Sequence, residues 1–450
     1  MKILRDYQEQ NAVLGVEKLK ALNLVYLAME VRTGKTATAL KIAELYGAGN
    51  VLFLTKKKAI PGIKRDYTDF GYSFNITVIN DESMHTVDGD FDMVIHDEHH
   101  RFGAFPKPGI CTKNFKDRFS HLPMIFLSGT PHPESYSQIF HQFHVSVRSP
   151  FSQYSNFYKW FKGMEFVKTT FDLGYGEVSN YSNNEESIYK YYGFQLRKIA
   201  KDDPLYIQKK TEVEADRARD IAQMHRSNAE LMKVIDPYMV KFTQEQAGFK
   251  SEVKEHILSV RMKDITYKII NKLKKDRVVR GNNEVILADT PVKVMSKVHQ
   301  LSSGTIKFES GNSAVIDSSK AEFIRERFKG YKIGIFYKFQ EELQMLKSVF
   351  DNNLCSDLDT FDSSDKNIAL QIVSGREGIS LKNADYLVYL NLDFSSLSYW
   401  QSRDRLTTMD RKSNDVFWIF SEGGIEQKIY DSVVKKRNYT TSVFSKQFLQ

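Results

Sequence analysis

The chain has 450 residues, enough for two or three domains with cores of their own, which excludes a single small module. Its formal charge of +8 and pI near 9.0 come from mixed acidic and basic residues and weakly favour a polyanionic partner such as nucleic acid. Cys111 and Cys355 lie outside any metal-ligand spacing, and no apolar run reaches the roughly 18 residues that span a bilayer. We therefore expect a soluble, intracellular protein without disulfides, a zinc site or a membrane segment.

A helix is predicted directly after the polar and aromatic stretch LRDYQ at residues 4–8. Its apolar face would consist of Val13, Val16, Leu19 and Leu22, which are spaced to line one side. Short apolar runs then alternate with helical or loop stretches, and this alternation predicts a parallel sheet with crossover helices. The strands predicted for this first domain are 24–28, 51–55, 76–79, 93–96 and 124–128.

The stretch MEVRTGKT at residues 29–36 lies between the first predicted strand and a helical segment at 37–46. A strand, a loop and a helix in this order form the setting of a phosphate-binding loop, whose backbone N–H groups point at bound phosphates. Gly34 would let the backbone approach the phosphate, Lys35 would reach the β and γ oxygens, and Thr36 would place its hydroxyl on Mg²⁺. A GKT in an ordinary surface turn is the alternative, because Met29 stands where the pattern has its first glycine.

Two more polar loops follow predicted strands. Asp97 and Glu98 come after 93–96, and the tetrapeptide SGTP at 128–131 comes at the end of 124–128. Ligands of parallel sheets bind at the carboxyl ends of the strands. One carboxylate there can hold Mg²⁺ through water, and a second can orient or deprotonate the water that attacks a γ-phosphate. Either loop alone also fits an ordinary solvated turn, but three such loops in this order indicate an ATP-hydrolysing site.

Five stretches resemble, in order, the Q-motif and motifs I, Ia, II and III of superfamily two helicases and translocases: LRDYQ, VRTGKT, LFLTKKKAI, VIHDEHH and FLSGTP. The DEHH form is similar to the DExH group, and the Swi/Snf-like branch of this superfamily also lacks the first glycine of motif I. The resemblance implies ATP and Mg²⁺ as cofactors. Gln8 would contact adenine, Lys35 would bind the phosphates, Thr36 and Asp97 would hold the metal, and Glu98 would be the catalytic base.

By the same resemblance, Arg5, Thr33 and Gly34 would complete the nucleotide site. Thr55 and the lysines at 56–58 would lie along a nucleic-acid track. Ser128 and Thr130 would couple ATP hydrolysis to movement.

Aromatic residues crowd the chain from residue 151, and long, charge-rich helical sequence follows to about residue 275. Apolar residues recur with helical spacing over 215–235 and 252–273, and residues 151–320 carry most of the excess positive charge. The aromatic residues could stack on nucleobases, but filling a small helical core is the favoured alternative for most of them. A basic cluster near residue 275 is the best candidate for phosphate contact, although a solvated charge run explains it equally well. The aromatic residues are Phe157, Tyr158, Trp160, Phe161, Tyr189, Tyr191, Tyr192 and Phe194, and the basic cluster comprises Lys272, Lys274, Lys275, Arg277 and Arg280.

The last third returns to the α/β pattern, with strands predicted at 333–337, 368–373 and 386–390 and a helix at 341–350. The stretches IGIFYKF, SGREGISL and YWQSRDRL resemble motifs IV, V and VI of the same superfamily. VHQLSSGTI, together with Lys320 in SSKAEFI, resembles the entry to the second RecA-like domain of Swi/Snf-like translocases.

These motifs imply that Gly378 contributes to the nucleotide site and that Gln401 and Arg405 face the nucleotide from the second domain. Thr408 stands where the pattern has a second arginine. Arg403 or Arg411 would replace that arginine finger, or Arg405 would act alone, and we include Arg411 among the nucleotide-binding candidates.

The sequence thus predicts an α/β fold with two RecA-like parallel-sheet domains, 1–150 and 311–450, flanking a helical, aromatic-rich insertion at 151–310 that engages nucleic acid. The resemblance implies a monomeric ATP-dependent DNA helicase or translocase that remodels forked and branched DNA. With its DEHH and Swi/Snf-like features the chain also resembles phage-encoded fork-remodelling and branch-migration helicases, which act in the cytoplasm of a host cell with replication or recombination proteins. One alternative is an RNA helicase or RNA-stimulated ATPase, because these motifs do not read the 2′-hydroxyl. The other is an ATP-switched clamp that grips nucleic acid without unwinding it.

Overall fold

The computed structural model describes residues 2–174, 176–249, 252–281, 283–375, 379–406 and 413–435. The chain divides into two units, Met1–Ala247 and Gly248–Gln450. A six-stranded sheet forms the centre of each unit, and its strand pairs are parallel. The predicted fold class, two RecA-like α/β domains with parallel sheets and a helical, aromatic-rich segment, is confirmed.

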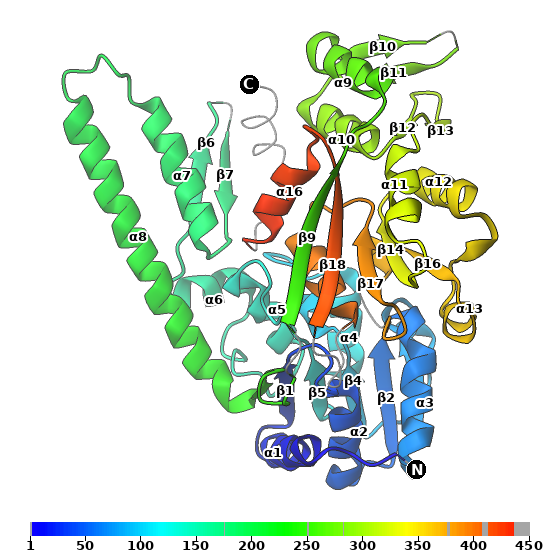
Figure 1. The fold of residues 1–450 in the computed structure, drawn as a ribbon. Coiled ribbons are helices and arrows are strands. Elements are labelled where there is room, and N and C mark those ends of the chain that lie inside the picture. Colours follow the sequence, from blue (N-terminus) through cyan, green and yellow to red (C-terminus); the bar gives the residue numbers. More distant parts are fainter. Residues whose placement is uncertain are drawn as a thin grey trace. The chain divides into compact units, whose positions relative to one another are not determined.

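The strands of the first unit lie in the order β3, β2, β4, β5, β1, β8, and Figure 1 labels β1, β2, β4 and β5 of this sheet. Five of them match the predicted strands to within one residue at either end. The strands are β1 (Leu24–Met29), β2 (Asn50–Thr55), β3 (Asn75–Asn80), β4 (Met93–His96), β5 (Met124–Leu127) and β8 (Met239–Phe242). The helices beside the sheet are α1 (Asp6–Leu22), α2 (Lys35–Tyr46), α3 (Ile60–Phe70), α4 (Ile110–Phe119) and α5 (Ile139–His144), with 3-10 turns at η1 (Lys57–Ala59), η2 (Asp81–Thr86), η3 (His99–Phe102), η4 (Tyr136–Gln138) and η5 (Asp236–Tyr238).

Side chains of this sheet alternate between two cores. Tyr26 and Phe126 pack with α4 and α5, whereas Val25 and Leu27 pack with α1, α2 and α3. Because helices cover both faces, each strand reads as a continuous apolar run rather than an alternating one.

The buried face of α1 differs from the predicted one. Val13 is 52% exposed, whereas Ala12 and Gly15 face the core. A Cβ atom at Gly15 would lie 2.4 Å from the Ile42 side chain of α2, so the two helices pack closely at this glycine. That close approach turns the helix so that Gly15 faces α2 and Val13 faces solvent.

The aromatic-rich segment belongs to the first unit and begins with α6 (Phe157–Gly163). Trp160 and Phe161 of α6 are buried in the sheet's own core, so the core-filling alternative holds for them, whereas Tyr158 and Tyr189 are exposed. The antiparallel hairpin of β6 (Thr169–Asp172) and β7 (Glu177–Asn180) follows, then α7 (Glu185–Lys198) and the long α8 (Tyr206–Ile235). The chain then returns to the sheet as β8, beside β1 (Figure 1).

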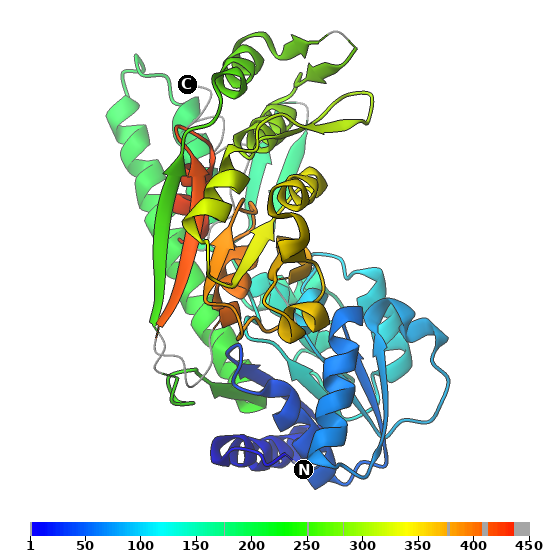
Figure 2. The same cartoon turned by 45° about the vertical axis from the view of Figure 1, so that its right-hand side comes forward.

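The second sheet has the strand order β15, β16, β14, β17, β18, β9. Its longest pair is β9 with β18, drawn side by side in green and red in Figure 2. Its strands are β9 (Glu252–Val260), β14 (Ile333–Tyr337), β15 (Leu354–Cys355), β16 (Asn367–Gln371), β17 (Tyr386–Tyr389) and β18 (Ser413–Ser421). The helices are α9 (Asp264–Asp276), α10 (Pro291–Ser302), α11 (Ser319–Arg327), α12 (Gln340–Phe350), α13 (Leu358–Ser363), α14 (Ile372–Gly375), α15 (Ser396–Arg403) and α16 (Glu426–Val433). Two 3-10 turns are η6 (Asp351–Asn353) and η7 (Asp404–Leu406). Two antiparallel hairpins lie outside the sheet: β10 (Val278–Arg280) pairs with β11 (Val285–Leu287), and β12 (Thr305–Lys307) pairs with β13 (Ser313–Val315).

The helical prediction for 252–273 is wrong over its first part, because residues Glu252–Val260 form strand β9. Val253, Ile257 and Val260 have helical spacing, but they are β-branched and lie in an edge strand that pairs with β18 along its whole length. The segment predicted as an insertion therefore supplies one strand to each sheet, β8 to the first and β9 to the second.

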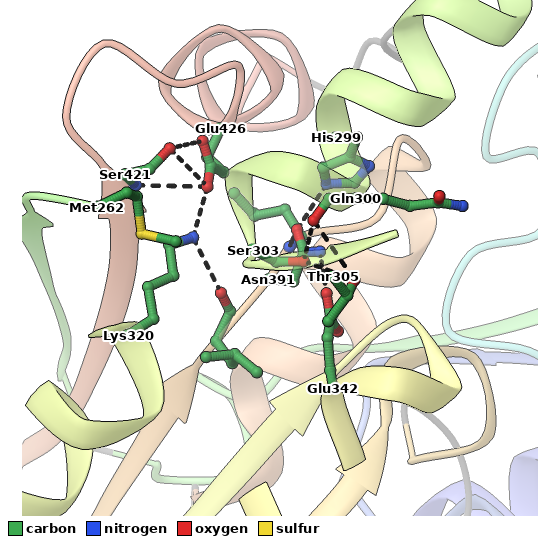
Figure 3. A network of polar contacts seen from close by, with 12 residues as sticks. Met262, His299, Gln300, Ser303, Thr305, Lys320, Glu342, Asn391, Ser421 and Glu426 are labelled. Atoms are coloured by element: carbon green, nitrogen blue, oxygen red, sulfur yellow. Dashed lines mark hydrogen bonds and ion pairs between the residues drawn. The ribbon is translucent and has the colours of Figure 1, made fainter. Parts of the chain in front are cut away.

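Buried polar contacts tie helices to the second sheet (Figure 3). Lys320 Nζ of α11, which is fully buried, donates to Glu426 Oε1 at 2.5 Å and to the Leu390 carbonyl at 3.3 Å. His299 Nε2 of α10 lies 2.5 Å from Asn391 Oδ1, and Asn391 Nδ2 donates to a carboxylate oxygen of Glu342 at 2.5 Å. Burial lowers the pKa of His299 well below 6.5 and raises the pKa of Glu342.

Among the described helices, none combines the length and apolar character needed to cross a bilayer.

Candidate active site

The loop between β1 and α2 has the shape that the phosphate-binding prediction requires. Gly34 caps α2 with φ of 86°, a left-handed conformation that glycine adopts without strain. The Thr33 hydroxyl donates to the Glu30 carbonyl at 2.7 Å and fixes the turn. Lys35, the first residue of α2, points its Nζ back over the loop and donates to the carbonyls of Met29 at 3.0 Å and Glu30 at 3.2 Å. The helix N-terminus and the ammonium group thus lie on the same loop, which suits a polyphosphate.

Gln8 of α1 lies directly against this loop. A Cβ atom at Gly34 would come within 1.9 Å of Gln8 Nε2, so a larger residue at position 34 would displace the Gln8 amide and would also be strained by the φ of 86°. The backbone N–H of Arg5 donates to Gln8 Oε1 at 2.9 Å, which orients the amide. The Arg5 side chain is exposed and donates to the Tyr7 hydroxyl at 3.0 Å. The structure therefore brings three predicted nucleotide-binding residues, Gln8, Gly34 and Lys35, into one place, with Thr36 in the first turn of α2.

Asp97 follows β4 and is held by two donors. The Thr55 hydroxyl, at the end of β2, donates to Oδ2 at 3.0 Å, and the Glu98 backbone N–H donates to Oδ1 at 3.0 Å. Burial, with a smaller contribution from the Glu98 charge, raises the pKa of Asp97 to about 6, although the Lys35 charge opposes the shift. The site thus carries a partly buried carboxylate that a bound cation would stabilise.

The oxygen atoms of this site also suit Mg²⁺, which prefers oxygen ligands and keeps several waters. Asp97 and the Thr36 hydroxyl could hold such an ion together with phosphate oxygens. In the described ranges no three His, Cys, Asp or Glu side chains gather as a ready-made metal cluster, and an ion held by one carboxylate and substrate phosphates needs none.

A chain of polar contacts joins the acidic loop to the SGTP loop. Glu98 has φ of 49°, and its Oε2 lies 3.3 Å from His100 Nδ1. The same nitrogen lies 2.9 Å from Ser128 Oγ, which accepts the Thr130 backbone N–H at 3.1 Å. The SGTP loop also lies next to Lys35, because a Cβ atom at Gly129 would lie 3.7 Å from Lys35 Nζ. The loops after β1, β4 and β5 therefore meet at one edge of the sheet.

Thr55 and the lysines that follow it differ in their exposure to solvent. The resemblance puts Thr55 on a nucleic-acid track, but the structure buries this residue and turns its hydroxyl to Asp97. Lys57 and Lys58, in η1, are exposed beyond the end of β2. Only the lysines of this group have the exposure that contact with an external polymer requires.

The predicted residues of the last motif lie in the second unit. Arg405, on η7, is 8% exposed and donates from Nη1 to the Ile379 carbonyl at 3.1 Å. Gln401 lies in α15. Arg403 donates to Glu255 Oε1 at 2.9 Å, and its guanidinium lies over the Trp400 ring at 4.4 Å. Gly378, Thr408 and Arg411 lie outside the described residues.

Sequence reasoning missed two contacts in this site. His100 stood inside the quoted DEHH stretch, but no role was assigned to it. Gln142 of α5 accepts from the Tyr26 hydroxyl at 2.8 Å and donates to the Pro131 carbonyl at 2.7 Å, so it ties the strand to the SGTP loop. His100 was detectable as a second histidine after a DE pair, whereas Gln142 has no sequence signal.

Comparisons with known proteins give distant likenesses only. No family model and no curated protein sequence matches the chain. Two similar solved structures are of a Sulfolobus solfataricus SWI2/SNF2 ATPase core. The core in complex with dsDNA is 14% identical, covers 100% of this chain and 93% of its own, and has a TM-score of 0.40. The core domain alone is 13% identical, covers 100% of this chain and 91% of its own, and has a TM-score of 0.38. Because both TM-scores lie below 0.5, neither structure is evidence for the activity of this chain.

Proposed function

We propose that this protein hydrolyses ATP with Mg²⁺ at the edge of the first sheet. The observation that carries the proposal is the convergence of three loops, after β1, β4 and β5, on one point where Lys35, Asp97 and the His100 to Ser128 contact lie together. Parallel sheets bind ligands at this edge.

In this proposal each residue has a role that its geometry suits. Lys35 would exchange its carbonyl acceptors for β and γ oxygens, since charged acceptors form stronger hydrogen bonds with an ammonium group. Gln8 would read the adenine beside Gly34, and Thr36 with Asp97 would hold Mg²⁺. The ion would neutralise charge that develops on the transferred phosphoryl group. Glu98, 3.3 Å from His100, would orient the attacking water.

We further propose that ATP hydrolysis drives movement along DNA. The exposed Lys57 and Lys58 at the same sheet edge and the basic residues of α9 are suited to phosphate contacts, and the chain carries a net charge of +8. The contact chain from Glu98 through His100 to Ser128 and Thr130 offers a route by which the state of the γ-phosphate changes the SGTP loop. Arg405, with Gln401, would act on the nucleotide from the second unit.

The finer proposal is that the motor remodels forked and branched DNA, as its sequence resemblance implies. The segment from α6 to α8 and the α9 region would select the junction, because they lie outside the catalytic loops. In this proposal the protein works as a monomer beside replication or recombination proteins.

One comparison tests the proposal and its alternatives. ATP turnover would be measured with single-stranded DNA, duplex DNA, forked DNA and RNA, together with strand separation and branch migration. Stimulation by DNA with separation of a fork is the expected result. Stimulation by RNA alone would identify an RNA-dependent enzyme, and turnover without separation or movement would identify a clamp. Absence of ATP hydrolysis with every polymer would overturn the proposal.

A further inference from the structure

A basic cavity of about 400 Å³ lies in the first unit, away from the loops that meet at the sheet edge. Its walls come from the chain before and within α4, from α5 and from the start of α6. Lys107, Lys113 and Lys116 line one part of it, and none of them forms an ion pair among the described residues. Asp117 is the single carboxylate in the lining, so the walls carry excess positive charge. That charge is suited to an anion.

Lys116 lacks an acidic partner even though it is partly buried. Its Nζ donates to His144 Nδ1 at 2.9 Å, and His144 Nε2 lies 3.0 Å from the Tyr154 carbonyl, which fixes the tautomer. Burial, with help from the Lys116 charge, lowers the pKa of His144 to about 4, so the imidazole is a neutral acceptor at neutral pH. Burial also lowers the pKa of Lys116, against the opposing charge of Asp117. An anion in the cavity would therefore gain from this ammonium without first breaking an ion pair.

Besides the lysines and several polar residues, the cavity wall has apolar and aromatic surface. Pro106, Pro108 and Val145 contribute apolar surface, and Tyr158, which is 46% exposed, contributes an aromatic ring. A bare phosphate would leave this surface uncovered, whereas a nucleotide carries both a phosphate and a planar base. The volume lies in the usual range of small-molecule sites, roughly 300 to 1,000 Å³.

From this combination we infer that the cavity binds one nucleotide unit, with its phosphate on Lys113 and Lys116 and its base against Tyr158. The nucleotide can come from two sources, a free mononucleotide or one residue of a single strand, and these share the same recognition chemistry. The second source rests on the proposed DNA-directed function. The first source does not.

The position of α5 gives such a ligand a short path to the candidate active site. His141 lines the cavity, and the neighbouring Gln142 donates to the Pro131 carbonyl of the SGTP loop at 2.7 Å. The same Gln142 also contacts Tyr26 and His99, which are buried beside that loop. Because α5 packs against both α4 and α6, a ligand held between those helices contacts the element that borders the site.

Photo-crosslinking with mapping by mass spectrometry tests the inference. The probes are 4-thiothymidine monophosphate and a short oligo-dT carrying one 4-thiothymidine, both used without ATP so that hydrolysis plays no part. We expect crosslinks in 106–117 or 155–158, and the probe that forms them identifies the source. Crosslinks confined to other segments with both probes would overturn the inference.

Variants give a second, independent measurement by anisotropy of a labelled oligo-dT and by competition with thymidine monophosphate. Tyr158→Ala should weaken binding of the crosslinking probe about tenfold, since the variant removes the ring on which the base would stack. Lys113→Gln, at an exposed lysine assigned to the phosphate, should lower the salt slope of strand binding by about 0.7, as expected for one lost contact. Lys162→Gln, an exposed lysine of α6 outside the cavity, is the matched control. If the cavity variants keep their melting temperature and bind both probes like Lys162→Gln, the assignment fails, whether or not the protein hydrolyses ATP.

Discussion

Lys35 donates to two carbonyl oxygens of its own loop, and phosphate oxygens can take the place of these neutral acceptors. Lys35→Ala should lower ATP turnover by at least about a hundredfold, because it removes a preorganised cation from charge that develops during transfer. Turnover with saturating nucleic acid is the measurement. Lys41→Ala on the same helix, whose Nζ pairs with Glu44, is the control and should keep activity. Near-normal turnover by a folded Lys35→Ala protein would contradict the ATPase proposal.

His100 is the residue through which two candidate catalytic loops touch. His100→Ala removes the contacts to Glu98 and Ser128, and a hydrogen bond to a charged group is worth roughly 1.5 to 3 kcal/mol. We expect DNA stimulation of turnover to fall about tenfold while ATP affinity stays close to that of the parent. His85→Ala, an exposed histidine of η2, controls for loss of an imidazole. Equal stimulation in the two variants would show that His100 does not couple the loops.

For single residues of the candidate site, the sequence predicted which residue types are present better than it predicted their contacts. Gly34, Lys35 and Asp97 could be found because phosphate chemistry requires particular groups after particular strands. The contact of His100 with Ser128 joins loops that follow different strands, and it depends on strand order and rotamers that no local pattern carries. The burial of Thr55 against Asp97 was missed for the same reason.

Helix α6 shows how one short element combines a buried and an exposed aromatic face. Trp160 is fully buried, whereas Tyr158 is 46% exposed. Trp160→Ala should lower the free energy of unfolding by about 3 to 5 kcal/mol, because it leaves a large cavity in the core. Tyr158→Ala, the matched control, should change stability by less than about 0.5 kcal/mol. Urea denaturation followed by circular dichroism measures both, and a stable Trp160→Ala protein would contradict the core assignment.

The buried histidine of α10 predicts a pH dependence for the second unit. The pKa of His299 is lower in the folded chain than its ordinary 6.5, so unfolding lets it take up a proton below that pH. Its contribution to the free energy of unfolding is therefore complete above pH 6.5 and is lost as pH falls, by about 1.4 kcal/mol per pH unit.

His299→Gln keeps a donor for Asn391 and removes the titration. Denaturant unfolding of parent and variant between neutral pH and pH 5 would show the difference, and His121→Gln, an exposed histidine, should follow the parent. Parallel pH profiles for parent and His299→Gln would mean that His299 is not held neutral by the fold.

The sequence predicts strands well where both faces of the strand are buried. The runs at 24–28, 93–96 and 333–337 became strands because helices cover both faces of each sheet. The sequence of the edge strand β9 predicts a helix because about half of its residues face solvent, and the apolar residues that remain have helical spacing. Pairing with β18, far along the chain, decides the conformation.

At the scale of the molecule, the basic cluster near residue 275 separates into two groups. Lys272, Lys275 and Arg280 are exposed, whereas Lys274 and Arg277 are partly buried at the end of α9. Changing the three exposed residues to Ala should reduce the salt slope of duplex binding by about 0.9 per lost phosphate contact. Binding across a series of salt concentrations is the measurement, with Lys210→Ala of α8 as the control. An unchanged slope would identify the cluster as a solvated charge run.

The middle of the chain was the part least open to prediction. Its aromatic residues are of the same types in a core and on a stacking surface, so only the fold separates Trp160 from Tyr158. The return of the chain to β1 through β8 was not foreseen, because a four-residue strand has too little sequence to show a period.

Helix α7, the adjoining part of α8 and Val167, just before β6, share a small core of their own, which consists of Val167, Ile188, Tyr192 and Met224. The end of α8 that follows, with Leu231 and Ile235, is anchored in the core of the sheet (Figure 1). Helix α8 has 30 residues, and a helix rises about 1.5 Å per residue. The length of α8 therefore sets how far its other end lies from the end that is buried in the core. Removing or adding whole turns in α7 and α8 together would change the reach of the tip in steps of about 5.4 Å, while the loops after β1, β4 and β5 keep their sequence. Chains with the same parallel sheets would then differ in how far this arm extends, and the number of helical turns would set that distance.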